Sequence, residues 1–237
     1  MCGIIGVISR GGRSVVSDLG NGTHFLQHRG PAYAGLFVFD PEHRSTALEK
    51  GEGLADDIFK PLGHLRGDVG IAHTRYKTHG GGGVDNAQPF FDPFTALAIA
   101  HNGHITNVQQ VEAELDNHGQ TLTSSCDAEA LLRVVSLWYE HYRKLDVECD
   151  EREIVFRTIT EVQQRLTGAY SAVLATPSGL YAFRDPHGFR PMVLGRRSRE
   201  GREAVMIASE TLALEQNGFE VEPVSYTHLT LPTNVSM

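Results

Sequence analysis

The sequence predicts three consecutive amphipathic helices in the middle of the chain, and most of the other regular segments are typical of short strands. Apolar residues recur every three or four positions over 107–118, 127–144 and 151–166, and a further helix is expected at 14–27. Shorter β-rich runs flank this helical block, at 3–8, 35–40, 69–73, 97–100, 170–176, 180–184, 191–195 and 204–208. Strands followed by helices and then by more strands predict a layered α+β architecture, because a βαβ fold would alternate the two.

The composition fits one large globular domain or two small ones. Of the 237 residues, 41% are hydrophobic and 21% are charged, proportions that exclude a disordered or collagen-like chain. No apolar run approaches the ~18 residues of a membrane span and no secretory signal opens the chain, so we expect no membrane partner. The formal net charge of −8 argues against a broad nucleic-acid surface.

Cysteine and histidine usage favours a protein of a reducing compartment without a bound metal. The 3 cysteines, at positions 2, 126 and 149, are an odd number and lie far apart, which does not suit a disulfide framework. We therefore expect the protein in the cytoplasm. Among the 12 histidines His24 and His28 stand four positions apart, but no C-x-x-C pair accompanies them, and the glycine loop at 80–83 lacks both nucleotide fingerprints. We expect no metal and no cofactor in this chain.

Cys2 is the first candidate for chemistry. Removal of Met1, which a small second residue favours, would leave a free α-amine with a reference pKa of roughly 7.7–8.0 beside the thiol. An amine that is partly neutral near pH 7 can serve as general base for the nucleophile on its own residue. Position alone favours a small residue at a frayed terminus, but the apolar run at 3–8 predicts a strand that anchors the terminus in a sheet.

Asn102 and Gly103 directly follow the strand expected at 97–100. A side-chain amide and an unhindered backbone N–H at a strand edge are the donors that an oxyanion hole needs, about 3 Å from the developing charge. Taken alone, an Asn-Gly pair is more often a plain turn.

Arg75 and Asp127 are candidates for binding a substrate that carries both charges. Arg75 lies at a strand end before the glycine loop and can bind a carboxylate through two parallel hydrogen bonds. Asp127 opens a helix and offers an anion to an ammonium group. The alternatives are pairing of Arg75 with one of the 29 acidic residues, and N-capping by Asp127.

Six separate motifs together resemble one family. They are M-C-G-I-I-G at the start, L-Q-H-R-G at 26–30, A-H-T-R-Y-K-T-H-G at 72–80, N-A-Q-P at 86–89, A-H-N-G at 100–103 and D-A-E at 127–129. In this order they are similar to the N-terminal-nucleophile glutamine amidotransferases. The glycine loop before N-A-Q-P and R-D-P-H-G-F-R-P at 184–191 resemble the amidophosphoribosyltransferases among them, and the resemblance covers about residues 2–223.

The resemblance implies a four-layer sandwich in which helices flank two antiparallel sheets, and hydrolysis of the side-chain amide of L-glutamine. It implies that Cys2 is the nucleophile, with its own amine as base. It also implies an oxyanion hole formed by Asn102 and the backbone N–H of Gly103. The implied glutamine contacts are Arg75 at the α-carboxylate, Asp127 at the α-ammonium, and Tyr76, Thr78 and Arg29 as supports of the pocket.

The family continues into a phosphoribosyltransferase domain whose acidic phosphate-loop signature does not occur in these 237 residues. The resemblance thus implies a glutaminase half. Phosphoribosyl pyrophosphate and Mg²⁺ would bind only to the further domain, and the full-length protein would form a homo-oligomer. No iron–sulfur cluster is assigned. Residues 224–237, rich in Ser, Thr and Asn, are set apart from the domain at 2–223 as a disordered or foreign tail without a partner strand.

The sequence leaves two alternatives open. One is the glutaminase domain of a hexosamine or asparagine synthase, which transfer of ammonia to fructose 6-phosphate or aspartate would identify. The other is a non-catalytic regulatory module with the same fold. A retained Met1 would favour the module, because a blocked amine cannot act as a base.

Overall fold

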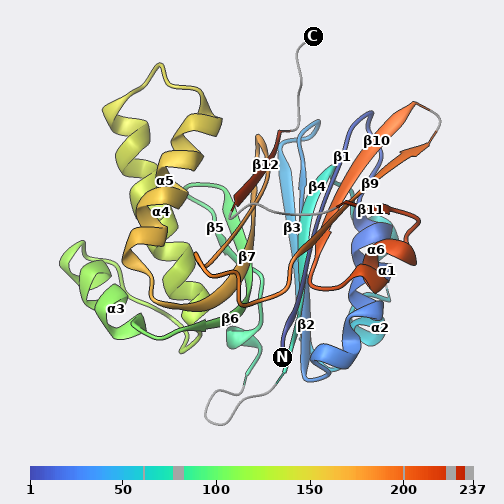
Figure 1. The fold of residues 1–237 in the computed structure, drawn as a ribbon, viewed down its shortest axis with the longest axis horizontal. Coiled ribbons are helices and arrows are strands. Elements are labelled where there is room, and N and C mark those ends of the chain that lie inside the picture. Colours follow the sequence, from blue (N-terminus) through green and yellow to red (C-terminus); the bar gives the residue numbers. More distant parts are fainter. Residues whose placement is uncertain (61, 77–82, 200, 223–227, 233–237) are drawn as a thin grey trace.

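In the computed structural model, two antiparallel sheets lie face to face and helices cover the outer face of each (Figure 1). The structure describes residues 1–60, 62–76, 83–199, 201–222 and, for the backbone alone, 228–232. The four-layer sandwich implied by the motifs is confirmed.

The larger sheet has the strand order β11-β9-β10-β1-β4-β2-β3. These strands are Glu220–Glu222, Val193–Arg199, Arg202–Ala208, Gly3–Ser9, Val69–Arg75, Tyr33–Asp40 and Ser45–Glu52. The first strand of the chain, β1, therefore lies inside the sheet, where Ile5 opposes Ala208 of β10 on one side and Ala72 of β4 on the other. The outer face packs on helices α1 (Val16–Phe25), α2 (Ala55–Ile58) and α6 (Thr211–Glu215).

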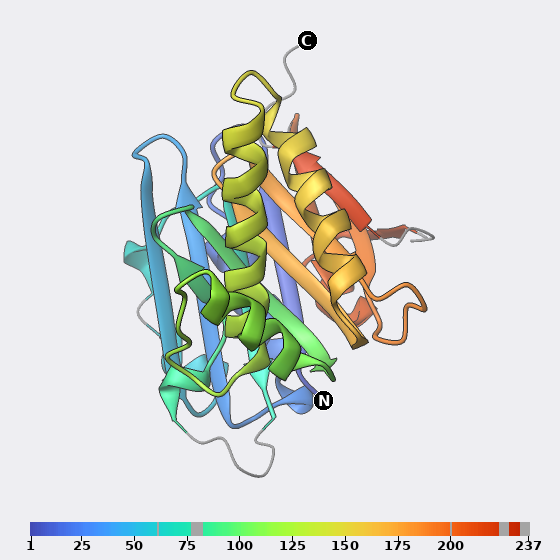
Figure 2. The same cartoon turned by 90° about the vertical axis from the view of Figure 1, so that its left-hand side faces the viewer.

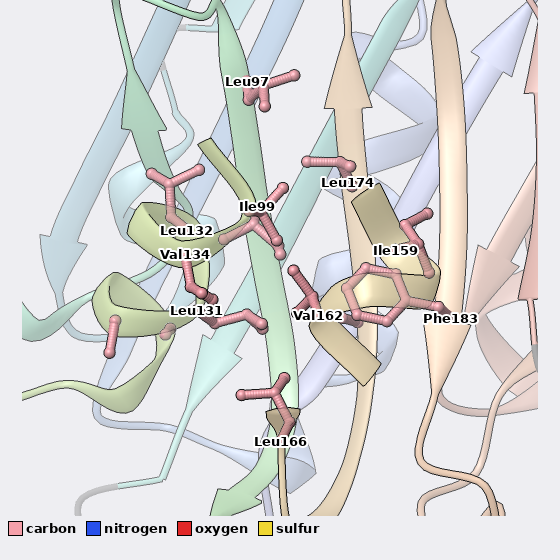
Figure 3. Close-up of a cluster of buried hydrophobic side chains, with 14 of the residues drawn as sticks. Leu97, Ile99, Leu131, Leu132, Val134, Ile159, Val162, Leu166, Leu174 and Phe183 are labelled. Atoms are coloured by element: carbon pink, nitrogen blue, oxygen red, sulfur yellow. The ribbon is translucent and has the colours of Figure 1, made fainter. Parts of the chain in front are cut away.

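The smaller sheet has the order β12-β8-β7-β6-β5. Its strands are His228–Pro232, Gly179–Arg184, Gly168–Thr176, Leu97–Ile105 and Phe90–Asp92. Its outer face is covered by α3 (Val108–Asn117), α4 (Asp127–Leu145) and α5 (Glu151–Arg165), and Figure 2 shows α4 and α5 lying across it. In this layer Leu131 of α4 and Val162 of α5 pack with Ile99 of β6 (Figure 3).

A second apolar layer fills the space between the sheets and fixes which way the side chains of β6 point. Ala98 and Ala100 belong to this inner layer, whereas Leu97 and Ile99 belong to the layer under α4 and α5. Because successive side chains of a strand point to opposite faces, Asn102 faces the space between the sheets and His101 faces the helices.

The structure departs from the sequence expectations mainly at strand ends and edges. Strand β6 continues through Asn102 and Gly103 to Ile105, so this Asn-Gly pair is not a turn. Strand β3, at 45–52, was not expected, because it is an edge strand whose largely exposed side chains show little apolar alternation. The short elements α2, α6, β5 and β11 were also missed.

The expectation that the tail has no partner strand is wrong for residues 228–232. Their backbone forms β12 and pairs with β8, with His228 opposite Phe183 and Pro232 opposite Gly179. The free N–H and C=O groups of an edge strand can pair with an extended segment through the backbone alone, so no apolar face is required. Residues 224–227 and 233–237 lie outside the described part of the chain.

A buried ion pair connects α1 to β9 and gives a stability prediction. Asp18 accepts hydrogen bonds of 2.8 and 2.6 Å from the guanidinium of Arg197, which also donates to the backbone carbonyl of Asn217. Removing one partner of such a pair leaves a buried charge uncompensated, so Asp18→Ala is expected to cost about 3–5 kcal/mol of unfolding free energy. Urea unfolding measures it.

The exposed pair of Asp57 with Lys60, at 2.7 Å, supplies the matched control. Solvent and salt screen this pair, so Asp57→Ala should leave the urea midpoint nearly unchanged. Equal midpoints for the two variants would contradict the role given to Asp18.

Candidate active site

The candidate site is a cavity of about 360 Å³ where the two sheets and α4 meet. Strand β1 begins beside the end of β4, with Gly3 opposite Thr74, and this register brings Cys2 next to Arg75. The last residues of β6 and the first residue of α4 complete the wall. The cavity is lined by Met1, Cys2, Arg75, Tyr76, Gln88, His101, Asn102, Gly103, His104, Cys126, Asp127 and Arg190.

A larger hollow of about 1000 Å³ lies between α1, α2 and the loop that follows α2. None of the described residues predicted for catalysis or glutamine binding lines it. The smaller cavity is therefore the better candidate, because it gathers the residues that can carry out chemistry.

Cys2 directly precedes β1, and its thiol is mostly protonated near neutral pH. Burial raises the pKa of this thiol, and a hydrogen bond from the backbone N–H of Tyr76 together with the nearby charges of the Met1 amino group and Arg75 offsets only part of the effect. Arg29 donates from Nε to the Cys2 carbonyl at 2.9 Å and forms an ion pair with Glu210. A thiol in this state needs a base before it can attack.

Asn102 supplies a buried donor without an acceptor. Its side chain is 2% exposed, and Nδ2 makes no hydrogen bond to any described residue. Gly103 follows with φ +147°, a conformation that side chains disfavour, and a Cβ there would lie 2.0 Å from the Ala169 carbonyl of β7. Gly103 therefore allows β6 to approach β7 closely, and Asn102 provides an unpaired amide at the cavity.

Arg75 ends β4 and is buried. Its guanidinium donates to the backbone carbonyl of Asn86 and lies 5.8 Å from the centre of the Tyr33 ring. Both contacts fix the direction of the side chain along the cavity wall. A fixed guanidinium suits a planar carboxylate, so the predicted role of Arg75 remains compatible with its surroundings.

Asp127 is the first residue of α4, yet it is not the helix cap. The N-cap is Cys126, and the Asp127 carboxylate instead accepts a hydrogen bond of 3.1 Å from the backbone N–H of Ile105 in β6. Ring nitrogens of His101 and His104 lie 3.4 and 3.5 Å from the same oxygen, Oδ2. Burial alone would raise the pKa of Asp127, but these three groups outweigh it and hold the pKa well below its usual range. Asp127 is thus a carboxylate at neutral pH.

Comparison with known proteins agrees with this geometry. Residues 73–216, more than half of the chain, match the glutamine amidotransferase domain family. The chain belongs to this family.

Two curated relatives of this glutamine amidotransferase illustrate how much of a longer protein it matches. It is 36% identical to the amidophosphoribosyltransferase of Pasteurella multocida over 226 residues, which cover 93% of this chain and 44% of the relative. The corresponding protein of Methanothermobacter thermautotrophicus is 35% identical over 237 residues, covering 96% and 47%. The chain therefore spans about half the length of the curated relatives it matches.

Solved structures give the same picture. The glutamine phosphoribosylpyrophosphate amidotransferase from B. subtilis superposes with a TM-score of 0.74 at 27% identity, over 100% of this chain and 50% of that chain. A structure described as the allosteric regulatory enzyme of purine biosynthesis gives a TM-score of 0.77 with the same identity and coverage.

The glutamine amidotransferase brings most of the predicted site residues together. Cys2, Arg75, Tyr76, Asn102, Gly103 and Asp127 all line the cavity. Arg29 does not line it and donates a hydrogen bond to the Cys2 carbonyl. Thr78 lies outside the described residues.

Apart from Met1, five further residues line the cavity without having been predicted: Gln88, His101, His104, Cys126 and Arg190. Gln88 and His101 lie inside the motifs N-A-Q-P and A-H-N-G. Their membership of these motifs could have indicated a place at the site, whereas their residue types alone could not. Burial and the Asp127 charge raise the pKa of the Cys126 thiol to about 11, which makes it a poor nucleophile beside Cys2.

The described residues contain no evident metal site and no helix that could span a membrane. No group of three or more His, Cys, Asp or Glu side chains in that part of the chain could hold a metal ion. Among the described helices, none is both long and apolar enough to cross a membrane.

Proposed function

We propose that this glutamine amidotransferase hydrolyses the side-chain amide of L-glutamine at Cys2. One observation carries the proposal: the buried Nδ2 of Asn102, without an acceptor among the described residues, belongs to a side chain of the cavity that also contains Cys2. A buried unpaired donor costs about 1–3 kcal/mol. Such a cost is offset where the donor stabilises a charge that develops only during the reaction.

The proposed reaction begins after removal of Met1. The α-amine of Cys2 accepts the proton of Sγ while sulfur attacks the amide carbon of glutamine, and the oxyanion receives hydrogen bonds from Asn102 Nδ2 and the N–H of Gly103. The protonated amine then gives its proton to the leaving nitrogen, and ammonia departs. Water hydrolyses the remaining thioester, which releases glutamate and restores the thiol.

Substrate recognition in this proposal uses the two fixed charges of the cavity. Arg75 binds the α-carboxylate of glutamine and Asp127 binds its α-ammonium group. The low pKa of Asp127 supports this role, because the carboxylate keeps its charge at neutral pH. Tyr76 lines the same cavity and Arg29 donates to the backbone carbonyl of Cys2. In this proposal Tyr76, Thr78 and Arg29 support glutamine binding.

We further propose that the full-length protein passes the ammonia to phosphoribosyl pyrophosphate. The names of the relatives and of the B. subtilis structure support this acceptor. Phosphoribosyl pyrophosphate and its Mg²⁺ would bind to the half of the relatives that this chain does not match, and the glutaminase half would need no cofactor. The reaction would serve purine synthesis in the cytoplasm, in a homo-oligomer.

An assay of the 237-residue polypeptide tests whether it hydrolyses glutamine without transferring ammonia to phosphoribosyl pyrophosphate. The polypeptide, with removal of Met1 verified by intact mass, is mixed with glutamine, Mg²⁺ and phosphoribosyl pyrophosphate, and glutamate and pyrophosphate are followed separately. Glutamate without pyrophosphate is expected, because all proposed catalytic groups lie before residue 130 and no phosphate-loop signature occurs in the sequence. Stoichiometric pyrophosphate release would contradict the proposal that the acceptor binds outside this chain. Absence of glutamate would contradict the proposed hydrolysis of glutamine.

A further inference from the structure

Gln88 and His101 form a buried pair beside Asp127 to which the proposed reaction assigns no role. Each is 2% exposed. Gln88 lies in the segment before β5, and His101 lies in β6 on the face that points toward the helices. The main chain around Gln88 is itself held tightly, because Lys50 Nζ donates to the Ala87 carbonyl at 2.8 Å. On the other side, a Cβ at Gly35 would lie 2.2 Å from the Gln88 carbonyl, so only glycine fits there.

The backbone of His101 decides which way the Gln88 amide is oriented. The main-chain N–H of His101 is a donor in every protonation state, and it donates to Gln88 Oε1 at 2.6 Å. The NH₂ group of the same amide must then be the atom that lies 3.2 Å from His101 Nδ1. Turning the amide over would place two donors against each other at 2.6 Å, so the assignment of oxygen and nitrogen is fixed.

The orientation of the amide in turn fixes the proton on the imidazole ring. An NH₂ group can only donate, so His101 Nδ1 has to accept and carries no hydrogen. The single proton of the neutral ring is then on Nε2, which lies 3.4 Å from Asp127 Oδ2 and makes no hydrogen bond to any described residue. A second proton on Nδ1 would face the NH₂ group, so Gln88 also disfavours the imidazolium.

A neutral donor has a specific consequence for Asp127. Asp127 Oδ2 accepts the hydrogen bond from the N–H of Ile105, and a neutral Nε2–H of His101, 3.4 Å from the same oxygen, faces it without adding a full positive charge. Among the described residues, Oδ1 has a weak contact of 3.9 Å with the Cys126 thiol. An imidazolium at the same place would form an ion pair with Asp127 and compete with any incoming cation.

We propose that Gln88 is a positioning residue that holds His101 in the Nε2–H tautomer, so that Asp127 is oriented but keeps its charge for the α-ammonium group of the substrate. This rests on the proposed function, in which Asp127 binds that group.

The first test is the tautomer itself in the intact chain labelled with ¹⁵N-histidine. Two-bond nitrogen–proton couplings distinguish the two neutral tautomers, and the signals of His101 are identified by their loss in His101→Asn. The wild-type ring is expected as Nε2–H, and an Nδ1–H ring would overturn the proposal. In Gln88→Glu a carboxylate replaces the NH₂ donor, so Nδ1 is expected to become protonated.

The second test is the kinetic effect of Gln88→Glu. The imidazolium should pair with Asp127, so KM for glutamine is expected to rise about tenfold, the scale of one hydrogen bond to a charged group, while kcat changes little. The matched control is Gln163→Glu: Gln163 donates to the Arg184 carbonyl at 2.8 Å and contacts no cavity residue in the described contacts. That control should change neither the His101 signals nor KM.

The outcomes separate the two proposals. An Nε2–H tautomer in a chain that does not hydrolyse glutamine overturns the proposed function. An active chain in which Gln88→Glu protonates Nδ1 without raising KM overturns the role of Gln88 alone.

Discussion

Replacement of Cys2 by serine is expected to lower glutamine hydrolysis by at least about 10³-fold, as removal of a nucleophile commonly does. The α-amine can take a proton from a thiol whose pKa lies only moderately above its own, but not effectively from a far less acidic hydroxyl. Glutamate release by the purified variant measures the loss. A glutamine analogue carrying a diazoketone should add one equivalent to the wild-type chain at Cys2, as peptide mass analysis would locate.

Cys149→Ser is the control for this replacement. Cys149 packs partly buried against the apolar layer under α4 and α5, outside the cavity, so its loss should preserve both hydrolysis and labelling. Cys126 is the second thiol that lines the cavity. Its raised pKa predicts that the analogue leaves it unlabelled. Labelling of Cys126 or Cys149 in place of Cys2 would contradict the assignment of the nucleophile.

Replacement of Asn102 by alanine is expected to lower kcat by about 10²–10³-fold, the effect of losing one donor of an oxyanion hole. The same change should leave the unfolding free energy almost unaffected, although the side chain is buried. The reason is that Nδ2 has no hydrogen bond to lose within the described structure, and its removal relieves an unpaired donor. Steady-state kinetics and urea unfolding of one preparation measure both effects.

Asn107 provides the opposite case. Its side chain donates to the Arg165 carbonyl at 2.7 Å and accepts from the Thr167 N–H at 2.8 Å, away from the cavity. Asn107→Ala should therefore lower stability by about 1–2 kcal/mol and preserve kcat. If Asn102→Ala loses stability as Asn107→Ala does while kcat persists, then Asn102 is a structural amide.

The sequence predicted the elements whose pattern is strong and local. The strand at β1 and the helices α4 and α5 were expected within two residues of their observed ends, because their apolar spacing is regular. Strand β3 and helix α6 were missed, since one is an exposed edge and the other has only Thr211–Glu215. The pairing of β1 between β4 and β10 was also beyond reach, because register between distant segments leaves no local signature.

The site was predictable where a motif resembles the family, and not where a contact depends on packing. Cys2, Asn102 and Asp127 were found through their motifs. That Asp127 accepts from Ile105 and not from its own helix depends on how α4 meets β6. Gln88 belongs to a recognised motif, but its amide acquires a role only when β5 and β6 bring it to His101.

The central position of β1 in its sheet also affects the order in which the sheet can form during synthesis on the ribosome. Ile4 of β1 donates to the Ser209 hydroxyl, across 205 positions of sequence. At a synthesis rate of roughly 5–20 residues per second, β10 leaves the ribosome about 10–40 s after β1. During that time β1 has no neighbour on that side. If Met1 is removed during this interval, as the proposed mechanism requires, the amine of Cys2 is freed before β10 completes the sheet around β1.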